Sequence, residues 1–196
     1  GMAGAGGAFS LPQPTMDILQ ALRAAGEGRG SMPSVGDGTW LGALKAAVEP
    51  LQIAVAITDM TVPGVTVHYC NGGFTRVTGY PKYEVEGRNC RFLQGDRTEP
   101  NIVSKMVRAL RKKKELLVKV TNYRKNGSRF TNDLSLTPVM DTNGEYRYSL
   151  GVLSCAEEQT PDEQQALATL RGLLPRRMPA AAQPSTFETN VVHVDE

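Results

Sequence analysis

The sequence contains few of the residues that build disulfide frameworks, metal sites or membrane spans. Its 196 residues include three cysteines and two histidines, and no metal-type spacing joins the cysteines to His68 or His193. An odd number of cysteines cannot all pair, so we expect a reduced, cytoplasmic protein without a metal. No apolar run approaches the roughly 20 residues of a transmembrane helix. The net charge of +2 does not by itself indicate a nucleic acid or a membrane as partner, and neither is expected.

Composition and periodicity divide the chain into five segments. Residues 1–37 form a glycine- and alanine-rich extension that we expect to be partly disordered, above all before residue 15. An amphipathic helix is predicted over 38–50, a dense core over 51–155, a second amphipathic helix over 156–175 and a disordered tail over 176–196. The apolar stripes of both helices require cover. We therefore expect them to pack on the outer face of a sheet or to pair between the subunits of a homodimer.

Three threonines stand where helix N-caps are expected. Thr15 is predicted to cap a short helix that ends at Gly26, and Thr98 to cap a longer helix with a basic C-terminal end. Thr160 is followed by a proline and then by Glu163 three residues after the cap, which is the capping-box pattern. These signals predict helices before, within and after the core.

The core alternates in the manner of β-strands. Strands are predicted over residues 51–59, 65–69, 116–123, 129–138 and 146–155, with short helical segments between the second and the third. In the first strand, bulky β-branched residues alternate with alanine and threonine, so one face is bulky and the other is small.

The nonapeptide Gly-Arg-Asn-Cys-Arg-Phe-Leu-Gln-Gly at residues 87–95 is the most informative motif. It presents the Cys90 thiol and the Arg91 cation on one short element, a combination suited to a reactive thiol beside an anionic group. Taken alone, a free cysteine is more often a small buried hydrophobe. The residues by themselves leave that alternative open.

Two asparagines interrupt apolar rows on the predicted strands. Asn122 shares a face with Leu116, Val118 and Val120, and Asn132 lies in a similar row on the next strand. A buried amide without partners costs about 1–3 kcal/mol, so the pair indicates a polar ligand. Each amide offers donors and an acceptor, which suits the alternating edge of a pyrimidine-type ring. The alternative is that the amides bond to each other or to backbone.

The nonapeptide and the segment Asn-Tyr-x-Lys-x-Gly-x-x-Phe-x-Asn at 122–132 resemble the signatures of LOV domains, the blue-light-sensing branch of the PAS superfamily. The resemblance extends over about residues 51–155. It implies an α+β fold in which a five-stranded antiparallel sheet carries a helical layer over one face, with amphipathic helices flanking the core.

The resemblance also implies a photoreceptor domain that is not an enzyme. It implies that the chain binds flavin non-covalently in the dark, as FMN or alternatively as riboflavin or FAD. Blue light then produces a reversible cysteinyl-flavin C4a adduct through Cys90, which we expect to start as a neutral thiol. The residues that the resemblance places at the flavin are Thr58, Asn89, Arg91, Leu93, Gln94, Val107, Asn122, Asn132, Leu134, Leu136, Gly151 and Leu153. An output domain or partner protein is expected outside this sequence.

The sequence departs from the family pattern at four positions. Leu153 replaces a glutamine that usually hydrogen-bonds the ring, and Val107 replaces a second phosphate-binding arginine. Val65 replaces a ribityl-binding asparagine, and Leu134 replaces an aromatic residue. The adduct needs only Cys90, but the usual relay of the signal is missing. The alternative interpretation is a flavin- or ligand-binding PAS module for dimerisation or redox sensing, in which a light response is incidental.

Overall fold

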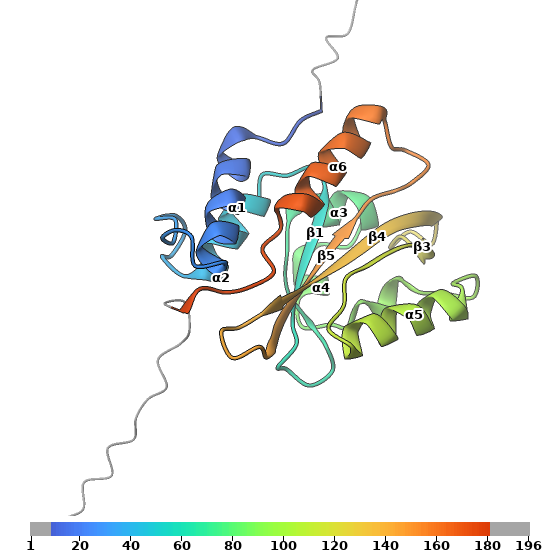
Figure 1. Cartoon of the computed structure of the whole chain (residues 1–196). Coiled ribbons are helices and arrows are strands. Elements are labelled where there is room, and N and C mark those ends of the chain that lie inside the picture. The colour runs from blue at the N-terminus through green and yellow to red at the C-terminus, as the bar shows by residue number, and fades with distance from the viewer. Residues whose placement is uncertain (1–8, 181–196) are drawn as a thin grey trace, which may run out of the picture.

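The computed structural model describes residues 9–180 and contains one five-stranded sheet with helices on both faces (Figure 1). The strands are β1 (Ala54–Asp59), β2 (Val67–Cys70), β3 (Leu116–Tyr123), β4 (Arg129–Met140) and β5 (Tyr146–Leu153). The helices are α1 (Gln13–Gly26), α2 (Trp40–Val48), α3 (Gly72–Thr78), α4 (Lys82–Val85), the 3₁₀ helix η1 (Cys90–Leu93), α5 (Pro100–Arg111) and α6 (Pro161–Leu173). All strand pairs are antiparallel, in the order β2-β1-β5-β4-β3. The predicted α+β fold is confirmed.

The alternation of bulky and small residues along β1 separates two apolar cores. Ile53, Val55 and Ile57 face the outer side of the sheet and join one cluster of buried side chains. Ala54 and Ala56 face the inner side and join a second cluster. Because side chains on a strand alternate between faces, this separation follows directly from the sequence.

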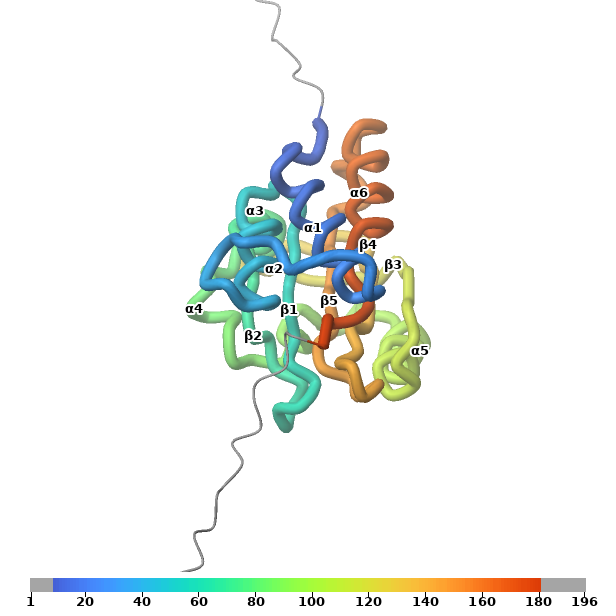
Figure 2. Tube along the Cα trace, turned by 60° about the vertical axis from the view of Figure 1, so that its left-hand side comes forward, coloured from blue at the N-terminus to red at the C-terminus, as the bar shows by residue number. Residues whose placement is uncertain are grey.

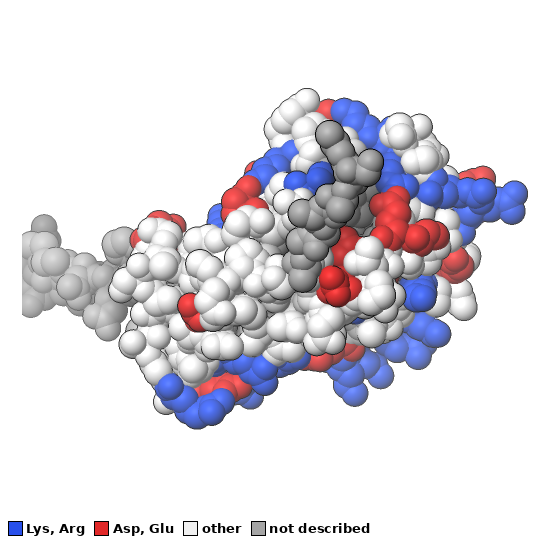
Figure 3. All heavy atoms as spheres, turned by 90° about the horizontal axis from the view of Figure 1, so that it is seen from above, with Lys and Arg blue, Asp and Glu red and all other residues white. Residues whose placement is uncertain are grey.

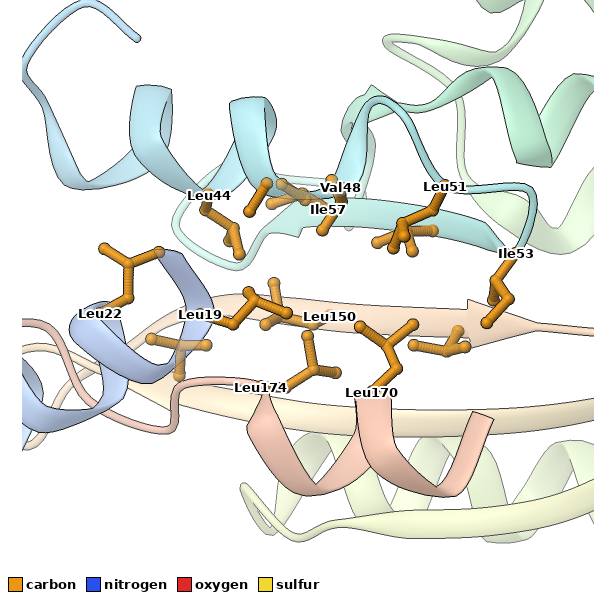
Figure 4. Close-up of a cluster of buried hydrophobic side chains, with 14 of the residues drawn as sticks. Leu19, Leu22, Leu44, Val48, Leu51, Ile53, Ile57, Leu150, Leu170 and Leu174 are labelled. Atoms are coloured by element: carbon orange, nitrogen blue, oxygen red, sulfur yellow. The ribbon is translucent and has the colours of Figure 1, made fainter. Parts of the chain in front are cut away.

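Helices α1, α2 and α6 cover the outer face of the sheet, as Figures 1 and 2 show. Trp40 of α2 stacks on Tyr148 of β5 with ring centroids 5.7 Å apart. Leu44, Leu170 and Leu174 are buried in the same cluster (Figure 4). The apolar stripes were predicted either to pack on the sheet or to pair between subunits. In the structure they pack on the sheet of the same subunit. A dimer that used these stripes would require the helices to leave the sheet.

Two of the three predicted threonine caps are wrong. Thr15 lies inside α1, and its hydroxyl donates to the Ala47 carbonyl at 2.8 Å. Thr98 lies before the start of α5, and its hydroxyl donates to the Thr121 carbonyl at 2.7 Å. In both cases the hydroxyl donates to a carbonyl of a distant element. The Thr98 oxygen also accepts from the N–H of Gly95, which precedes α5, at 3.0 Å. Thr160, whose partners are local in sequence, forms the predicted capping box.

Both ends of the described region are more ordered than the sequence analysis predicted. Leu11, which precedes α1, is buried in the outer cluster, and Phe9 packs against the same cluster. At the other end, Met178 is buried and its N–H donates to the Met140 carbonyl at 2.8 Å. The predicted disorder is therefore wrong for residues 9–14 and 176–178. Residues 1–8 and 181–196, which include His193, lie outside the described residues.

Truncation of Leu170 tests the contribution of the C-terminal flanking helix to stability. The side chain is fully buried between α6 and the sheet. We expect Leu170→Ala to lower the free energy of unfolding by about 2–5 kcal/mol, through lost apolar contact and a residual cavity. Urea unfolding followed by tryptophan fluorescence measures the change. Leu117→Ala, at a side chain 60% exposed, is the control and should change stability by less than about 0.5 kcal/mol. Equal effects would contradict the packing of α6.

Candidate functional site

Small side chains form the floor of the inner core, the region between the sheet and helices α3, α4, η1 and α5 that we call the chamber. Ala56 of β1 pairs with Gly151 of β5, and Ala54 pairs with Leu153. A Cβ placed on Gly151 would meet Leu136 and Leu153 at 3.8 Å, which is ordinary van der Waals contact. Leucine side chains therefore pack directly above this floor.

Apolar side chains from the helices form the wall opposite this floor. The inner cluster combines strand residues with side chains of α3, α4, η1 and α5, namely Phe74, Val77, Val85, Leu93, Ile102 and Met106. Ile102 and Met106 are four residues apart on α5 and so share its inward face. Neither they nor Val77 are among the residues predicted at the site, because helical periodicity does not reveal which part of the core an inward face contacts.

Cys90 is the first residue of η1 and packs at the margin of the inner cluster. Its side chain is half-buried by the relative exposure of the residue. Burial of the sulfur raises the pKa of the Cys90 thiol to about 12, because a low-dielectric environment disfavours the thiolate. The thiol is therefore neutral near pH 7, in agreement with the sequence prediction.

Asn89 holds the reactive element in place. Its amide nitrogen donates to the carbonyls of Gly64, at 2.7 Å, and Val65, at 3.2 Å. Its amide oxygen accepts from the Arg91 N–H at 3.0 Å, which caps η1. Asn89 thus ties η1 to the turn before β2 and orients Cys90. Arg91 is exposed and forms no ion pair with any residue that the structure describes.

The two predicted asparagines meet inside the chamber. The Asn132 amide nitrogen donates to the Asn122 amide oxygen at 2.9 Å, and the Asn122 nitrogen donates to the Thr121 carbonyl at 3.1 Å. Both side chains are buried, and Asn132 Oδ1 has no hydrogen-bond partner. The alternative in which the amides bond to each other and to backbone is therefore present. It leaves one acceptor unsatisfied, at a cost of about 1–3 kcal/mol, which a ligand donor would relieve.

The other predicted residues divide between the chamber and its surroundings. Leu93, Leu134, Leu136 and Leu153 belong to the inner cluster. Thr58 and Gln94 are half-buried. Thr58 lies in β1 and Gln94 directly follows η1, and both of these elements contribute side chains to the inner cluster. Val107 is 40% exposed and does not belong to the cluster. The structure thus unites most of the predicted residues and leaves Val107 apart.

The residues present fit a flavin. A small floor and apolar walls suit a flat aromatic ring, and the unsatisfied Asn132 carbonyl suits the N–H of its pyrimidine edge. Asn122 and Asn132 would hold that edge, and the exposed Arg91 would hold a phosphate. Cys90 would place a neutral thiol at the side of the ring.

Comparisons with curated proteins identify photoreceptors among the relatives. The chain is 38% identical over 109 residues to phototropin-2 of Oryza sativa, which is 56% of this chain and 12% of that protein. It is 39% identical over 105 residues to a blue-light-activated histidine kinase of Rhizobium johnstonii, which is 54% of this chain and 30% of the kinase. The chain therefore corresponds to a small part of these relatives.

Solved structures share the same fold. A structure described as showing how a flavin analogue sheds light on light-oxygen-voltage domain mechanism superimposes with a TM-score of 0.55 and 36% identity, over 66% of this chain and 91% of that chain. The light-state dimer of the fungal blue-light photoreceptor Vivid superimposes with a TM-score of 0.51 and 34% identity. That match covers 53% of this chain and 77% of Vivid.

The comparisons overturn one expectation, that the protein is not an enzyme. The Rhizobium relative is a histidine kinase by name, so the family includes proteins in which such a domain belongs to an enzyme. The error has a simple cause, since the matched segment is the sensory region and carries no sign of the chemistry found elsewhere in its relatives.

Residues 9–180 contain no group of three or more His, Cys, Asp or Glu side chains that could hold a metal ion. None of the helices in that region is long and apolar enough to cross a membrane.

A family model described as PAS domain matches residues 54–155, just over half of the chain. The matched region coincides with the sheet and with the chamber that holds Cys90, Asn122 and Asn132. Its relatives and structural neighbours are phototropins, blue-light-activated histidine kinases and LOV domains. The chain therefore belongs to the PAS family, and its core is a LOV domain of the kind found in blue-light photoreceptors.

Proposed function

We propose that this LOV domain binds FMN in the chamber and senses blue light through Cys90. The observation that carries the proposal is a neutral, half-buried thiol at the margin of a chamber that also contains an unsatisfied buried amide oxygen. A flavin bound there would supply the blue-light absorption and an electrophilic ring that could accept both the sulfur and the proton of the Cys90 thiol.

The residues of the chain have separate tasks in this proposal. Asn122 and Asn132 hold the polar edge of the ring and fix its orientation. The apolar wall excludes water, and Asn89 fixes the position of η1 and hence of the thiol. An absorption spectrum before and after blue light tests the proposal. A yellow protein that bleaches and recovers in the dark supports it, whereas a bound flavin without reversible bleaching favours a module for dimerisation or redox sensing.

The identity of the flavin depends on Arg91. It is the one cation preserved at a phosphate-binding position of the family, while Val107 offers no charge. We expect FMN to be the major flavin released on denaturation, with more riboflavin or FAD than in relatives with two arginines. Chromatography of the flavins released from protein expressed in cells that supply all three measures this. A released pool with almost no FMN would refute the assignment of Arg91.

Hydrogen bonds connect Asn132 and its neighbours to the linker that precedes the C-terminal flanking helix. The linker after β5 pairs with β4, through an isolated bridge between Asn132 and Cys155 and through hydrogen bonds of 2.8 Å on either side. Arg124 donates to the Cys155 sulfur at 3.4 Å and forms an ion pair with Glu158 at 2.8 Å. We infer that a rotation of the Asn132 amide reaches α6 through this linker, in place of the missing glutamine.

Leu153 removes the usual polar contact with the ring. It is buried on the inner face next to Gly151, and it also lines a small cavity of about 70 Å³ that reaches Cys155. We expect Leu153→Gln to shift the flavin absorption to the red and to leave the bleaching reversible. The added hydrogen bond stabilises the excited flavin more than its ground state. Absorption spectroscopy measures both effects. Superimposable spectra would show that residue 153 does not lie against the ring.

Relatives of this domain are larger proteins, since the match covers 12% of phototropin-2 and 30% of the Rhizobium kinase. The relatives include a histidine kinase and a photoreceptor solved as a light-state dimer. We infer that this domain regulates an output domain or a partner protein, and that light loosens a flanking helix enough to allow a homodimer. Three free cysteines are consistent with a reducing, cytoplasmic location.

A further inference from the structure

Positive charge is concentrated in one segment, which covers most of α5, the turn after it and the start of β3. Residues 105–119 contain seven basic side chains and one acidic side chain, whereas the whole chain has 22 basic and 20 acidic groups. The remainder of the chain therefore carries more acidic than basic groups. The small net charge conceals this asymmetry, which is a sign of interaction with a polyanion. On the face shown in Figure 3, acidic side chains gather toward the middle and basic side chains lie mainly along the edges.

The basic side chains occupy the outer face of α5 and the turn that follows it. Lys105, Arg108 and Lys112 are three and four positions apart, so they lie on one side of the helix. All three are exposed, as are Arg111, Lys113 and Lys114. We call these six residues the basic patch. Helix α5 lies beside β3 at the edge of the molecule, and no other helix covers its outer side in Figures 1 and 2.

Most of the basic patch lacks an anionic partner. No acidic residue occurs between Pro100 and Lys114. Within the described part of the chain, Lys113 forms an exposed ion pair with Glu145 at 3.8 Å, and the other five cations form none. Neighbouring like charges on a helix reduce its stability. Because one exposed ion pair is the only such compensation among the described residues, the patch is better suited to an external anion than to the fold.

The side chains around the patch indicate the kind of anion. Four of its six cations are lysines, and no aromatic residue accompanies them. Specific protein interfaces are instead enriched in arginine and aromatic residues and depleted in lysine. A single-stranded nucleic acid site would need aromatic rings for base stacking, and residues 100–119 contain none. Val107, 40% exposed and one helical turn before Arg111 on α5, supplies apolar surface beside the cations. Lysine-rich charge with exposed aliphatic groups is typical of contact with an anionic lipid surface.

We propose that the basic patch docks this domain on a bilayer surface that contains anionic phospholipid. The cations of α5 and its following turn approach the lipid phosphates and carboxylates, and Val107 of the same helix enters the headgroup region. This contact is peripheral and independent of the flavin chamber on the inner face of the sheet. It adds a partner that the net charge of the chain did not predict.

Vesicle co-sedimentation of the full chain, in the dark, tests the proposal. We expect binding to phosphatidylcholine vesicles that contain about one third phosphatidylserine, no binding to phosphatidylcholine alone, and loss of binding in high salt. Arg111→Gln/Lys112→Gln/Lys114→Gln should weaken binding about 100-fold, since each cation near an anionic surface contributes about fivefold. Arg29→Gln/Lys125→Gln/Arg129→Gln removes the same charge elsewhere and is the matched control. Equal losses in both variants, or no binding by the parent, would refute the proposal.

A second pair of variants separates lipid insertion from attraction to any polyanion. Val107→Ser should weaken vesicle binding several-fold, whereas Val62→Ser, at another exposed aliphatic residue 44% exposed, should not. Because both side chains lie on the surface, neither change should affect the fold. If Val107→Ser binds like the parent, or if the parent binds a DNA duplex more tightly than the anionic vesicles, the partner is not a membrane.

Discussion

Replacement of Cys90 by alanine is expected to abolish reversible bleaching while leaving the flavin bound. The reason is that Cys90 supplies the sulfur of the proposed bond, whereas the ring is held by the asparagines and the apolar walls. The variant should therefore be yellow and remain fluorescent under blue light. The measurement is the absorption of the flavin band before illumination, directly after it and through dark recovery.

Cys155→Ala is the matched control for this experiment. Cys155 is also a buried free cysteine, but it lies in the linker after β5 and outside the inner cluster. We expect this variant to bleach and recover, with a changed recovery rate if the linker affects the chamber. If Cys90→Ala bleached and recovered normally, Cys90 would not be the reacting thiol.

Replacement of both chamber asparagines by leucine should remove flavin binding without loss of stability in the apoprotein. The double variant Asn122→Leu/Asn132→Leu removes a pair of amides that leaves one buried oxygen unsatisfied. Exchange of both hydrogen-bond partners for apolar groups of similar size is nearly neutral or stabilising. Flavin affinity should fall by roughly 30- to 1000-fold, since each of two to four lost hydrogen bonds contributes about 1 kcal/mol. Equilibrium dialysis with FMN and urea unfolding of the apoproteins give the two quantities.

The single variant Asn132→Leu distinguishes a ligand site from a structural pair. In the apoprotein it leaves the Asn122 oxygen without its donor but also removes the unsatisfied Asn132 oxygen. The free energy of unfolding should therefore fall only by the net contribution of one hydrogen bond, about 1 kcal/mol. The double variant should recover this loss. If the double variant were the less stable of the two, the asparagines would serve the fold, and the chamber would not have been kept polar for a ligand.

The sequence by itself determined the chemistry of the site and the faces of the sheet. The order of residues around Cys90 and the spacing from Asn122 to Asn132 identified the family, and a strand period of two placed Ala54 and Ala56 on the same inner face. The capping box at Thr160 was also predictable. These features depend on residues that are close in sequence or on a fixed period, so no knowledge of distant contacts is required.

Only the tertiary structure decided which partners the polar groups would find. Thr15 and Thr98 donate to carbonyls of other elements and therefore do not cap helices. Asn132 bonds to Asn122 and keeps one free acceptor, and Val107 lies outside the chamber. The net charge of +2 likewise did not predict an exposed basic patch in which five of six cations lack an ion pair among the described residues. In each case the outcome depends on which groups folding brings within hydrogen-bond or ion-pair distance, and a linear pattern does not contain those distances.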